Sequence, residues 1–155
     1  MIRLQREDFD VGAEIDALTR GRADIGGVCS FVGQVREVGE GGELEALVLE
    51  HYPAMTERQL ADIEAEACRR WPLTATLIIH RYGRLKPAER IVLVVAASAH
   101  RDAAFEACRF MIDWLKTKAP FWKREDSTLG PRWVEARAAD DASAERWRRA
   151  PGDTR

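Results

Sequence analysis

A basic segment in the last third of the chain carries the residues best suited to chemistry. It reads Lys-Thr-Lys-Ala-Pro-Phe-Trp-Lys-Arg-Glu over residues 116–125. An apolar run ends at Leu115, and Pro120 predicts that a helix stops just before it. Lys116 then lies in a last helical turn and Lys123 on a following extended segment, so the two can converge. Ammonium groups held close together lose a proton more readily, and a neutral amine is a nucleophile or a base.

A second group of polar residues lies at a strand-to-helix junction. Ser98-Ala-His-Arg-Asp102 separates an apolar, strand-like run from a long amphipathic helix. Such a junction presents free backbone N–H groups and the positive end of the helix dipole, which favour anions. His100 can act as acid, base or donor near neutral pH, and Arg101 can bind phosphate or carboxylate through paired hydrogen bonds. A helix cap followed by a solvated arginine explains these residues equally well.

Arg36 is a third candidate. It follows a β-rich run and precedes a glycine-rich loop at residues 37–43, where a phosphate-binding arginine could lie. Position alone favours an ordinary solvated loop arginine, so Arg36 needs support from other residues.

The aromatic pair inside the basic segment has two interpretations. Phe121 and Trp122 could stack on a planar ring such as a pterin or a nucleic-acid base. They could instead be a hydrophobic anchor that fixes the backbone of the segment. The sequence leaves both interpretations open.

Composition limits the class of protein. The chain has 155 residues, which suits one domain, with 46% hydrophobic and 32% charged residues. The net charge of −2 and the pI of about 6.0 argue against a general nucleic-acid binder, which usually has a basic surplus. No apolar run approaches the length of a membrane span, and the N-terminus lacks a signal-peptide core. We therefore expect a cytoplasmic protein.

Cysteine and histidine patterns do not predict a metal site. The three cysteines, Cys29, Cys68 and Cys108, are widely spaced and form no Cys-x-x-Cys pair, so we expect them to be small buried hydrophobic residues. The histidines at 51, 80 and 100 form no local ligand pair. The chain also lacks a Walker loop and a Gly-x-Ser-x-Gly motif.

Hydrophobic periodicity predicts an α+β fold with mostly antiparallel sheet. Two long helices are expected over residues 53–71 and 101–118, the first with a capping box at Thr56 to Gln59. Gly33 lies inside a predicted strand, where a bulge or a close backbone approach would explain it. Predicted strands cover 1–5, 28–35, 44–51, 74–82, 90–97 and 132–137, with a short helix at 10–20. Residues 1–138 are interpreted as one domain, and 139–155 as a polar tail with a short helix.

Four segments of the chain resemble the catalytic (large) subunit of molybdopterin synthase, the MoaE family. They are, in order, Phe31-Val-Gly-Gln-Val-Arg36, Leu49-Glu-His-Tyr-Pro-Ala-Met-Thr56, Ser98-Ala-His-Arg101 and the basic segment 116–125. Gly130-Pro-Arg-Trp-Val-Glu-Ala-Arg137 continues the resemblance, which covers roughly residues 8 to 138. The basic segment is long and unusual in composition, so it is the most specific of these motifs.

This resemblance implies a function and a set of partners. The family converts cyclic pyranopterin monophosphate (precursor Z) to molybdopterin by inserting two sulfurs as a dithiolene. The sulfur comes from the C-terminal Gly-Gly thiocarboxylate of a small ubiquitin-like subunit. Two large subunits form a central dimer with a small subunit at each end, and the fold has a hammerhead-like arrangement. The resemblance implies no cofactor and no metal, and it explains why a sulfurtransferase would need no cysteine of its own.

The resemblance also implies roles for individual residues. Lys116 and Lys123 match the catalytic lysines, with Lys116 near the terminal glycine of the partner and Lys123 at the pterin. Residues that match the substrate-binding pocket are Arg36, His100, Arg101, Lys116, Lys123, Phe31 and Arg137. In the family dimer this pocket lies near the subunit interface, so His100 and Arg101 are expected to act across it.

Two other functions compete with this one. The basic aromatic segment could be a platform for single-stranded nucleic acid, with salt-dependent binding that is lost on Trp122→Ala. The chain could also bind the ubiquitin-like partner without catalysis. The joint presence of both lysines with Arg36, His100 and Arg101 favours the enzyme.

Overall fold

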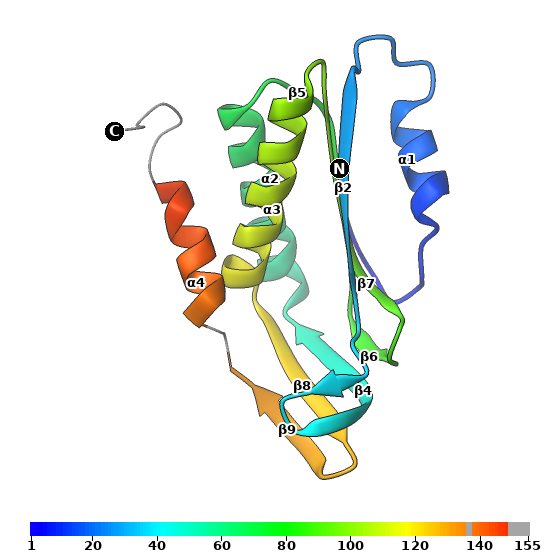
Figure 1. Cartoon of the computed structure of the whole chain (residues 1–155), viewed down its shortest axis with the longest axis vertical. Helices are drawn as coiled ribbons and strands as arrows, with labels where there is room; N and C mark the ends of the chain where they lie inside the picture. Colours follow the sequence, from blue (N-terminus) through cyan, green and yellow to red (C-terminus); the bar gives the residue numbers. More distant parts are fainter. Residues whose placement is uncertain (136–137, 149–155) are drawn as a thin grey trace.

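The chain forms two β-sheets, which lie one beyond the other along the longest axis of the molecule (Figure 1). The structure is a computed structural model, and it describes residues 1–135 and 138–148. In chain order the elements are β1 (Ile2–Gln5), α1 (Val11–Thr19), β2 (Gly27–Gln34), β3 (Val38–Gly39), β4 (Gly42–His51), α2 (Pro53–Arg70), β5 (Leu73–Arg81), β6 (Gly83–Leu85), β7 (Arg90–Ser98), α3 (Arg101–Lys118), β8 (Phe121–Ser127), β9 (Gly130–Val134), α4 (Ala138–Glu145) and the 3-10 helix η1 (Arg146–Arg148).

The strand order confirms the predicted fold class. The first sheet has the order β1-β5-β7-β2, in which β1 and β5 are parallel and the other neighbours antiparallel. The second sheet has the order β3-β4-β8-β9, with β6 beside β4, and these pairs are antiparallel. The protein is therefore α+β with mostly antiparallel sheet.

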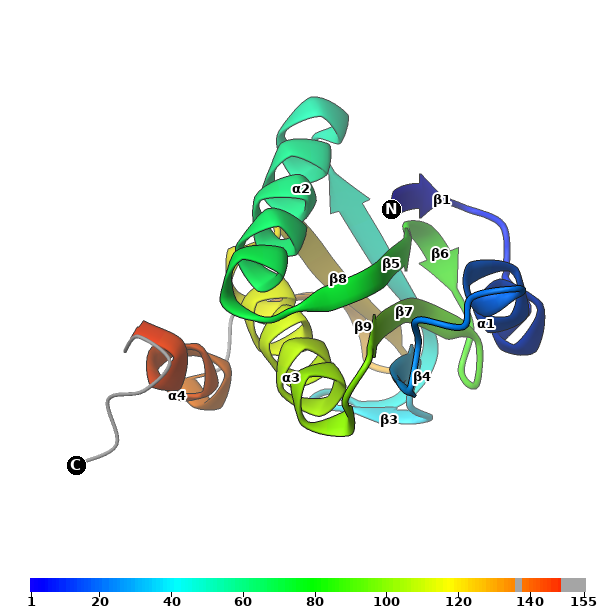
Figure 2. The ribbon, with the colours of Figure 1, turned by 90° about the horizontal axis from the view of Figure 1, so that it is seen from above.

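Helices cover both faces of the first sheet (Figure 2). Ile78, Val94 and Ala96 belong to the apolar cluster under α2 and α3. Their neighbours along the strands, Leu77 and Val95, belong to the cluster under α1. Because successive side chains of a strand point to opposite faces, strands covered on both sides carry continuous apolar runs, as Leu77–Ile79 of β5 and Ile91–Ala97 of β7 do.

Helix α2 begins differently from the sequence prediction. Pro53 occupies the first turn, where its missing N–H costs no hydrogen bond, and Tyr52 is the cap without a side-chain hydrogen bond. Thr56 is buried, and its hydroxyl donates to the carbonyl of Tyr52 at 2.9 Å. The predicted capping box at Thr56 and Gln59 is therefore wrong, because the helix already starts three residues earlier.

Helix α3 has the predicted bounds. Its buried face includes Ala104, Cys108, Met111 and Leu115, which recur at helical spacing. The helix ends at Ala119, whose N–H donates to the Leu115 carbonyl at 3.2 Å, immediately before the proline. The chain then turns into β8, which places the second half of the basic segment on a strand, as expected.

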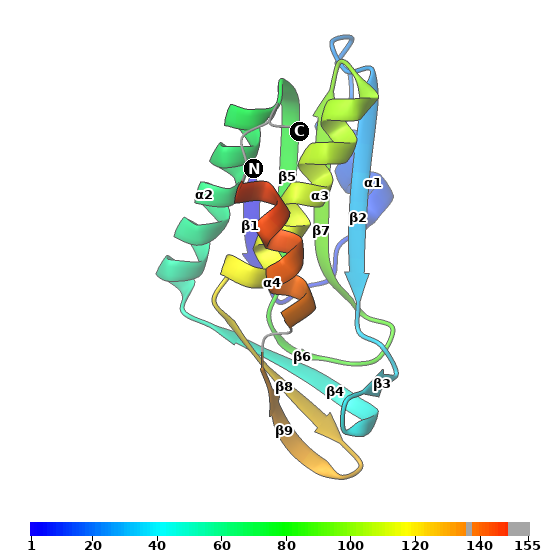
Figure 3. The same cartoon turned by 60° about the vertical axis from the view of Figure 1, so that its left-hand side comes forward.

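The second sheet lies beyond the ends of the two long helices (Figure 3). Strand β8 is central, with Lys123 opposite Leu49 of β4 and Val134 of β9. The predicted loop at 37–43 contains the short strand β3, which pairs with the start of β4. The predicted irregularity at Gly33 is confirmed, since the β2–β7 register shifts after it and a Cβ there would lie 2.7 Å from Cγ1 of Val92.

The C-terminal helices pack against the rest of the molecule. Helix α4 lies along α3, and Trp147 of η1 enters the main apolar cluster. The indole N–H of Trp147 donates to Asp113 at 2.8 Å, and Trp71 meets the indole edge-on at 5.6 Å. The sequence predicted a short helix in this region, whereas the anchoring contact of Trp147 depends on tertiary packing.

The cysteine prediction is correct for Cys108 and wrong for Cys68. Cys108 is buried, Cys29 is half-buried and Cys68 is exposed. Cys68 follows Ala67, which belongs to the buried stripe of α2. One residue turns a helix by about 100°, so Cys68 leaves that stripe. None of the described helices is long and apolar enough to span a bilayer.

Candidate active site

The cations of the basic segment fall into two groups. Lys118 lies over the ring of Trp114, with 3.4 Å between Nζ and the centroid. Arg124 forms an ion pair with Asp126 at 2.8 Å. Lys116, in the last turn of α3, is exposed and has no hydrogen-bond or ion-pair partner among the described residues. Two of the four cations thus have structural partners, while Lys116 remains accessible to a ligand.

Lys123 lies on the inner face of β8. Phe121, Lys123 and Glu125 alternate with Trp122 and Arg124, so these two sets point to opposite faces of the sheet. Lys123 pairs in register with the buried Leu49, yet its own side chain is exposed. Lys123 is therefore an exposed cation on the face of β8 that also carries Phe121 and the buried Glu125.

Four rings form an aromatic cluster at the start of β8, defined as His51, His80, Tyr82 and Phe121. His80 and Phe121 stack with 3.8 Å between centroids and 15° between planes. His51 meets Tyr82 at 4.5 Å and Phe121 at 5.7 Å. Phe121 is therefore an anchor within the protein, and the nucleic-acid platform loses one of its two stacking residues.

Trp122 points away from the aromatic cluster. It meets Tyr52 edge-on at 5.1 Å, and 46% of its surface is exposed. Of the predicted aromatic pair, Trp122 is the one available for an external contact.

The histidines of the aromatic cluster are held neutral. Burial lowers the pKa of His80 to about 4, and the positive charge of Lys123 acts in the same direction. A hydrogen bond to the Arg81 carbonyl opposes this shift. Burial also lowers the pKa of His51. At neutral pH both histidine rings are therefore uncharged.

Glu125 joins the hairpin loop to β8. Its carboxylate is buried and accepts the N–H of Glu40 at 3.1 Å. Gly39 lies so close to this carboxylate that a Cβ there would overlap it. The loop that carries β3 is thus fixed beside the strand of Lys123.

Arg36 and Phe31 come from strand β2 and the residues after it. Phe31 is 37% exposed, and Arg36 is exposed directly after the buried Val35. Strand β2 and helix α3 both run opposite to β7 (Figure 1). Arg36 and Lys116 therefore lie toward the same end of the molecule.

His100 and Arg101 lie at the other end of α3. His100 caps the helix without a side-chain hydrogen bond, and its N–H lies 3.4 Å from Oγ of Ser98. The Arg101 side chain is 83% exposed and lies 3.8 Å from Asp102. Gly27 permits this packing, since a Cβ there would lie 3.2 Å from Cα of Arg101.

One chain does not bring all the predicted residues together. Arg101 and Lys116 are fifteen residues apart on one continuous helix, which separates their Cα atoms by about 22 Å. The predicted site therefore divides into a lysine end, defined as Lys116, Lys123 and Arg36, and a junction end, defined as His100 and Arg101. Arg137 lies outside the described residues.

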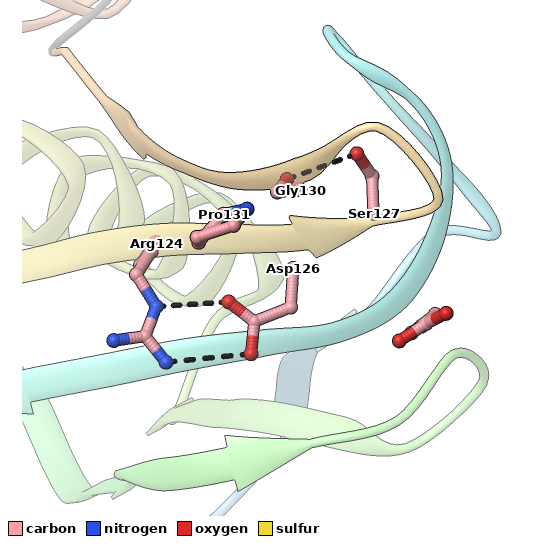
Figure 4. A pocket seen from close by; sticks show the side chains of 6 residues that line it. Arg124, Asp126, Ser127, Gly130 and Pro131 are labelled. Atoms are coloured by element: carbon pink, nitrogen blue, oxygen red, sulfur yellow. Dashed lines mark hydrogen bonds and ion pairs between the residues drawn. The ribbon is translucent and has the colours of Figure 1, made fainter.

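The hollow shown in Figure 4 does not coincide with the lysine end. It is shallow, about 390 Å³, and its lining residues are Glu45, Arg124, Asp126, Ser127, Gly130 and Pro131. Arg124 and Asp126 pair with each other there, on the face of β8 opposite Lys123. No cluster of metal-ligating side chains occurs within residues 1–135 and 138–148.

Sequence reasoning missed two residues of this region. His80 belongs to an apolar strand that carries no local signal of function, and its relation to Lys123 depends on packing between two sheets. Glu125 was recognised only as the end of the basic segment. A buried carboxylate next to a glycine-rich loop is visible only once β3 and β8 are placed.

Comparison with known proteins gives consistent matches. The sequence model described as MoaE protein matches residues 4–118. The chain is 57% identical to the molybdopterin synthase catalytic subunit of Mesorhizobium japonicum, over 95% of this chain and 92% of that protein. It is 56% identical to the protein of the same name from Pseudomonas aeruginosa, over 94% and 97% of the two chains.

A solved structure matches the fold as well. The molybdopterin biosynthesis MoaE protein from Burkholderia ambifaria superposes with a TM-score of 0.81 and 49% sequence identity. The match covers 95% of this chain and 97% of that chain. The similarity therefore includes both sheets and both long helices.

Proposed function

Because this chain belongs to the MoaE family, we propose that it is the catalytic subunit of a molybdopterin synthase. In this role it is a cytoplasmic sulfurtransferase of molybdenum cofactor biosynthesis. It converts cyclic pyranopterin monophosphate to molybdopterin by inserting two sulfur atoms into the pterin as a dithiolene. The chain spans more than nine-tenths of the curated relatives cited above, which supports carrying their activity over to it.

The observation that carries the proposal is the exposure of two lysines of the basic segment at one end of the molecule. Lys116 is exposed and has no hydrogen-bond or ion-pair partner among the described residues, and Lys123 is exposed near the same end of the molecule. A cyclic phosphate and a thiocarboxylate are both anions, and amines at such a place can bind them and exchange protons with the reacting groups. Lys116 is assigned to the partner's terminal glycine and Lys123 to the pterin.

The proposed partners follow from the same function. A small ubiquitin-like subunit delivers sulfur through its C-terminal thiocarboxylate. This explains why Cys108 can be buried in the core and still leave sulfur chemistry possible. The protein itself needs only to bind anions and move protons, and we propose no cofactor or metal for these steps.

A second copy of the chain completes the proposed site. The junction end and the lysine end of one chain lie about 22 Å apart along a single helix. His100 and Arg101 can therefore bind the same small substrate as Lys116 only if they come from another subunit. In the proposed central dimer, each pocket uses the lysine end of one subunit and the junction end of the other.

Single lysine variants test this function. Lys116→Ala and Lys123→Ala should each reduce product formation at least about a hundredfold with precursor and thiocarboxylated partner, because general acid–base groups typically contribute that much. Lys118→Ala is the matched control and should keep wild-type turnover. Full activity of both Lys116→Ala and Lys123→Ala would overturn the proposal. A wild-type protein that binds the partner but forms no product would instead favour a binding module.

A further inference from the structure

Ala88 has a backbone conformation that is uncommon for a residue with a side chain. Its φ is 70°, and no other non-glycine residue has positive φ within the described part of the chain. The Ala88 side chain is exposed, so packing of its methyl group does not explain this conformation. A left-handed residue other than glycine costs free energy and persists only where the surrounding structure holds it. The contacts around Ala88 therefore indicate what this strain maintains.

Ala88 lies in a tight turn over residues 86–89, between β6 and β7. The Glu89 N–H donates to the Lys86 carbonyl at 3.1 Å, and Pro87 occupies the second position, where its fixed φ suits the turn. A turn with proline in second place and positive φ in third place is of type II, for which glycine is the usual third residue. The Glu89 carboxylate also accepts the Lys86 N–H. The turn is therefore closed by two hydrogen bonds of its own despite the alanine.

The buried Arg81 braces the end of this turn. Its guanidinium donates to the carbonyls of Arg6 and Arg90 at 2.9 Å each. It also donates to the Glu89 carboxylate at 3.5 Å. One side chain thus joins three segments of the chain at the point where the turn enters β7.

The turn holds the backbone of Val35 through two hydrogen bonds. The Ala88 N–H donates to the Val35 carbonyl at 2.8 Å, and the Val35 N–H donates to the Glu89 carbonyl at 2.9 Å. We call this pair of hydrogen bonds the Val35 clamp. Val35 is also buried in one apolar cluster with Leu85, the residue before the turn. Both its backbone and its side chain are therefore fixed.

Arg36 lies between two fixed residues. Val35 before it is held by the clamp, and the carbonyl of Glu37 after it accepts the Leu44 N–H at 2.8 Å. The Arg36 side chain is exposed and has no hydrogen-bond or ion-pair partner among the described residues. A fixed backbone reduces the conformational freedom that is lost when such a side chain binds a ligand. Arg36 is therefore an available cation on an ordered backbone.

We propose that the turn at residues 86–89, with Ala88 as its strained position, orients Arg36 toward the anionic part of the substrate. Ala88 is a positioning residue, since it acts only through Val35 and Arg36. Its left-handed conformation maintains the Val35 clamp, and the clamp sets the direction in which the chain carries Arg36. The role of Arg36 toward the substrate rests on the function proposed above, whereas the clamp does not.

Amide hydrogen exchange in the full-length protein tests the clamp without substrate. The rate at the Val35 N–H is measured by NMR relative to that at the buried Val94 of β7. In Ala88→Val a β-branched residue resists the left-handed conformation, so Val35 should exchange about tenfold faster. In Ala88→Gly, which adopts this conformation without strain, the rate should stay within about twofold of the wild type. An unchanged rate at Val35 in Ala88→Val would overturn the proposal.

A second variant loosens the turn without adding strain, in case Ala88→Val does not fold. Glu89→Ala keeps the backbone of the clamp but removes the carboxylate that accepts from Lys86 and Arg81. Val35 should then exchange about threefold faster, because hydrogen bonds that close the turn are lost. Where only this variant folds, a wild-type rate at Val35 would overturn the proposal.

Turnover measures the consequence for the substrate. Ala88→Val should raise the KM for the cyclic pyranopterin about tenfold and keep kcat within about twofold, because a binding arginine is displaced while the lysines stay in place. Ala88→Gly should keep the wild-type KM. Ala61→Val makes the same change at an exposed position of α2, and this matched control should also keep the wild-type KM.

Arg36→Ala separates this proposal from the proposed function. A raised KM in Arg36→Ala beside a wild-type KM in Ala88→Val would overturn the positioning role alone. A wild-type KM in Arg36→Ala would remove Arg36 from the substrate site and overturn the positioning role with it. In either case Lys116→Ala and Lys123→Ala still decide the proposed function.

Discussion

The ring of His80 in the first sheet stacks on the ring of Phe121 in the second, with 15° between their planes. This contact joins the two sheets at the point where the chain leaves α3. Lys116 lies just before this point and Lys123 just after it. The relative placement of the two lysines therefore depends on aromatic packing as well as on the backbone turn at Pro120.

Phe121→Ala should destabilise the protein substantially. The substitution removes a ring that contacts His80 and His51, and we expect the free energy of unfolding to fall by about 3 kcal/mol. Urea unfolding at pH 7.5 measures the change. Trp122→Ala is the matched control on the neighbouring, exposed position and should cost less than about 1 kcal/mol. Equal losses for the two variants would argue against the anchor.

Stability should decrease in mildly acidic solution. Folded His80 has a pKa lowered to about 4 by burial, whereas an unfolded histidine titrates near 6.5. The unfolded chain therefore binds the extra proton, so stability is complete above pH 6.5 and is lost as pH falls toward 4. From pH 7.5 to pH 5 the expected loss is about 2 kcal/mol, and the lowered pKa of His51 acts in the same direction.

Urea unfolding at several pH values checks this prediction. The pKa values of the Asp8 and Glu66 carboxyls are also shifted. Hydrogen-bonded ion pairs with Arg90 and Arg69 lower the pKa of each carboxyl to about 2. Their contribution is lost only below the ordinary carboxyl range, so the interval from pH 7.5 to pH 5 reports on histidine. A constant free energy of unfolding over this interval would contradict a neutral, buried His80.

Lys118→Ala should affect stability but not turnover. The ammonium lies over Trp114, a cation–π contact worth about 0.5–1 kcal/mol at an exposed site. Thermal unfolding and the sulfur-transfer assay, performed on the same preparation, test both statements. Loss of turnover in a folded Lys118→Ala protein would show that the division of the cations into two groups is wrong.

Trp147→Ala should remove the contact between η1 and the apolar core and lower the stability of the protein. The indole packs against Trp71 and Phe110 and donates to Asp113, so a loss of about 3–5 kcal/mol in the free energy of unfolding is expected. Trp133→Ala, at a 53% exposed position, should cost less than about 1 kcal/mol. A small effect at Trp147 would mean that η1 contributes little to the fold.

Local sequence signals predicted most of the fold. The bounds of α3 follow from its apolar stripe and from Pro120, and the alternation after Gly42 predicted β4. Local signals failed where two of them competed. Thr56 has the spacing of a capping box, but the proline at 53 starts the helix first. Cys68 lies in an apolar helix, but one residue beyond the buried stripe.

The candidate site was predicted as a set of residue types but not as an arrangement. The basic segment correctly placed Lys116 on a helix end and Lys123 on a strand. Three side-chain contacts could not be predicted, because no pattern within a single segment contains them. They are Lys118 over Trp114, Arg124 with Asp126, and the stack of His80 on Phe121. The roles of the individual site residues remain predictions, with Arg137 outside the described residues.

The length of α3 has a genetic consequence. An unbroken helix is stiff, so bending of the chain cannot bring Arg101 to Lys116, and two defective alleles can complement each other. Equal amounts of Lys116→Ala and Arg101→Ala subunits, mixed so that dimers exchange, should form mixed dimers in which one pocket carries both defects and the other neither. About a quarter of wild-type activity should then reappear from two inactive preparations. Sites contained within single subunits would show no such recovery.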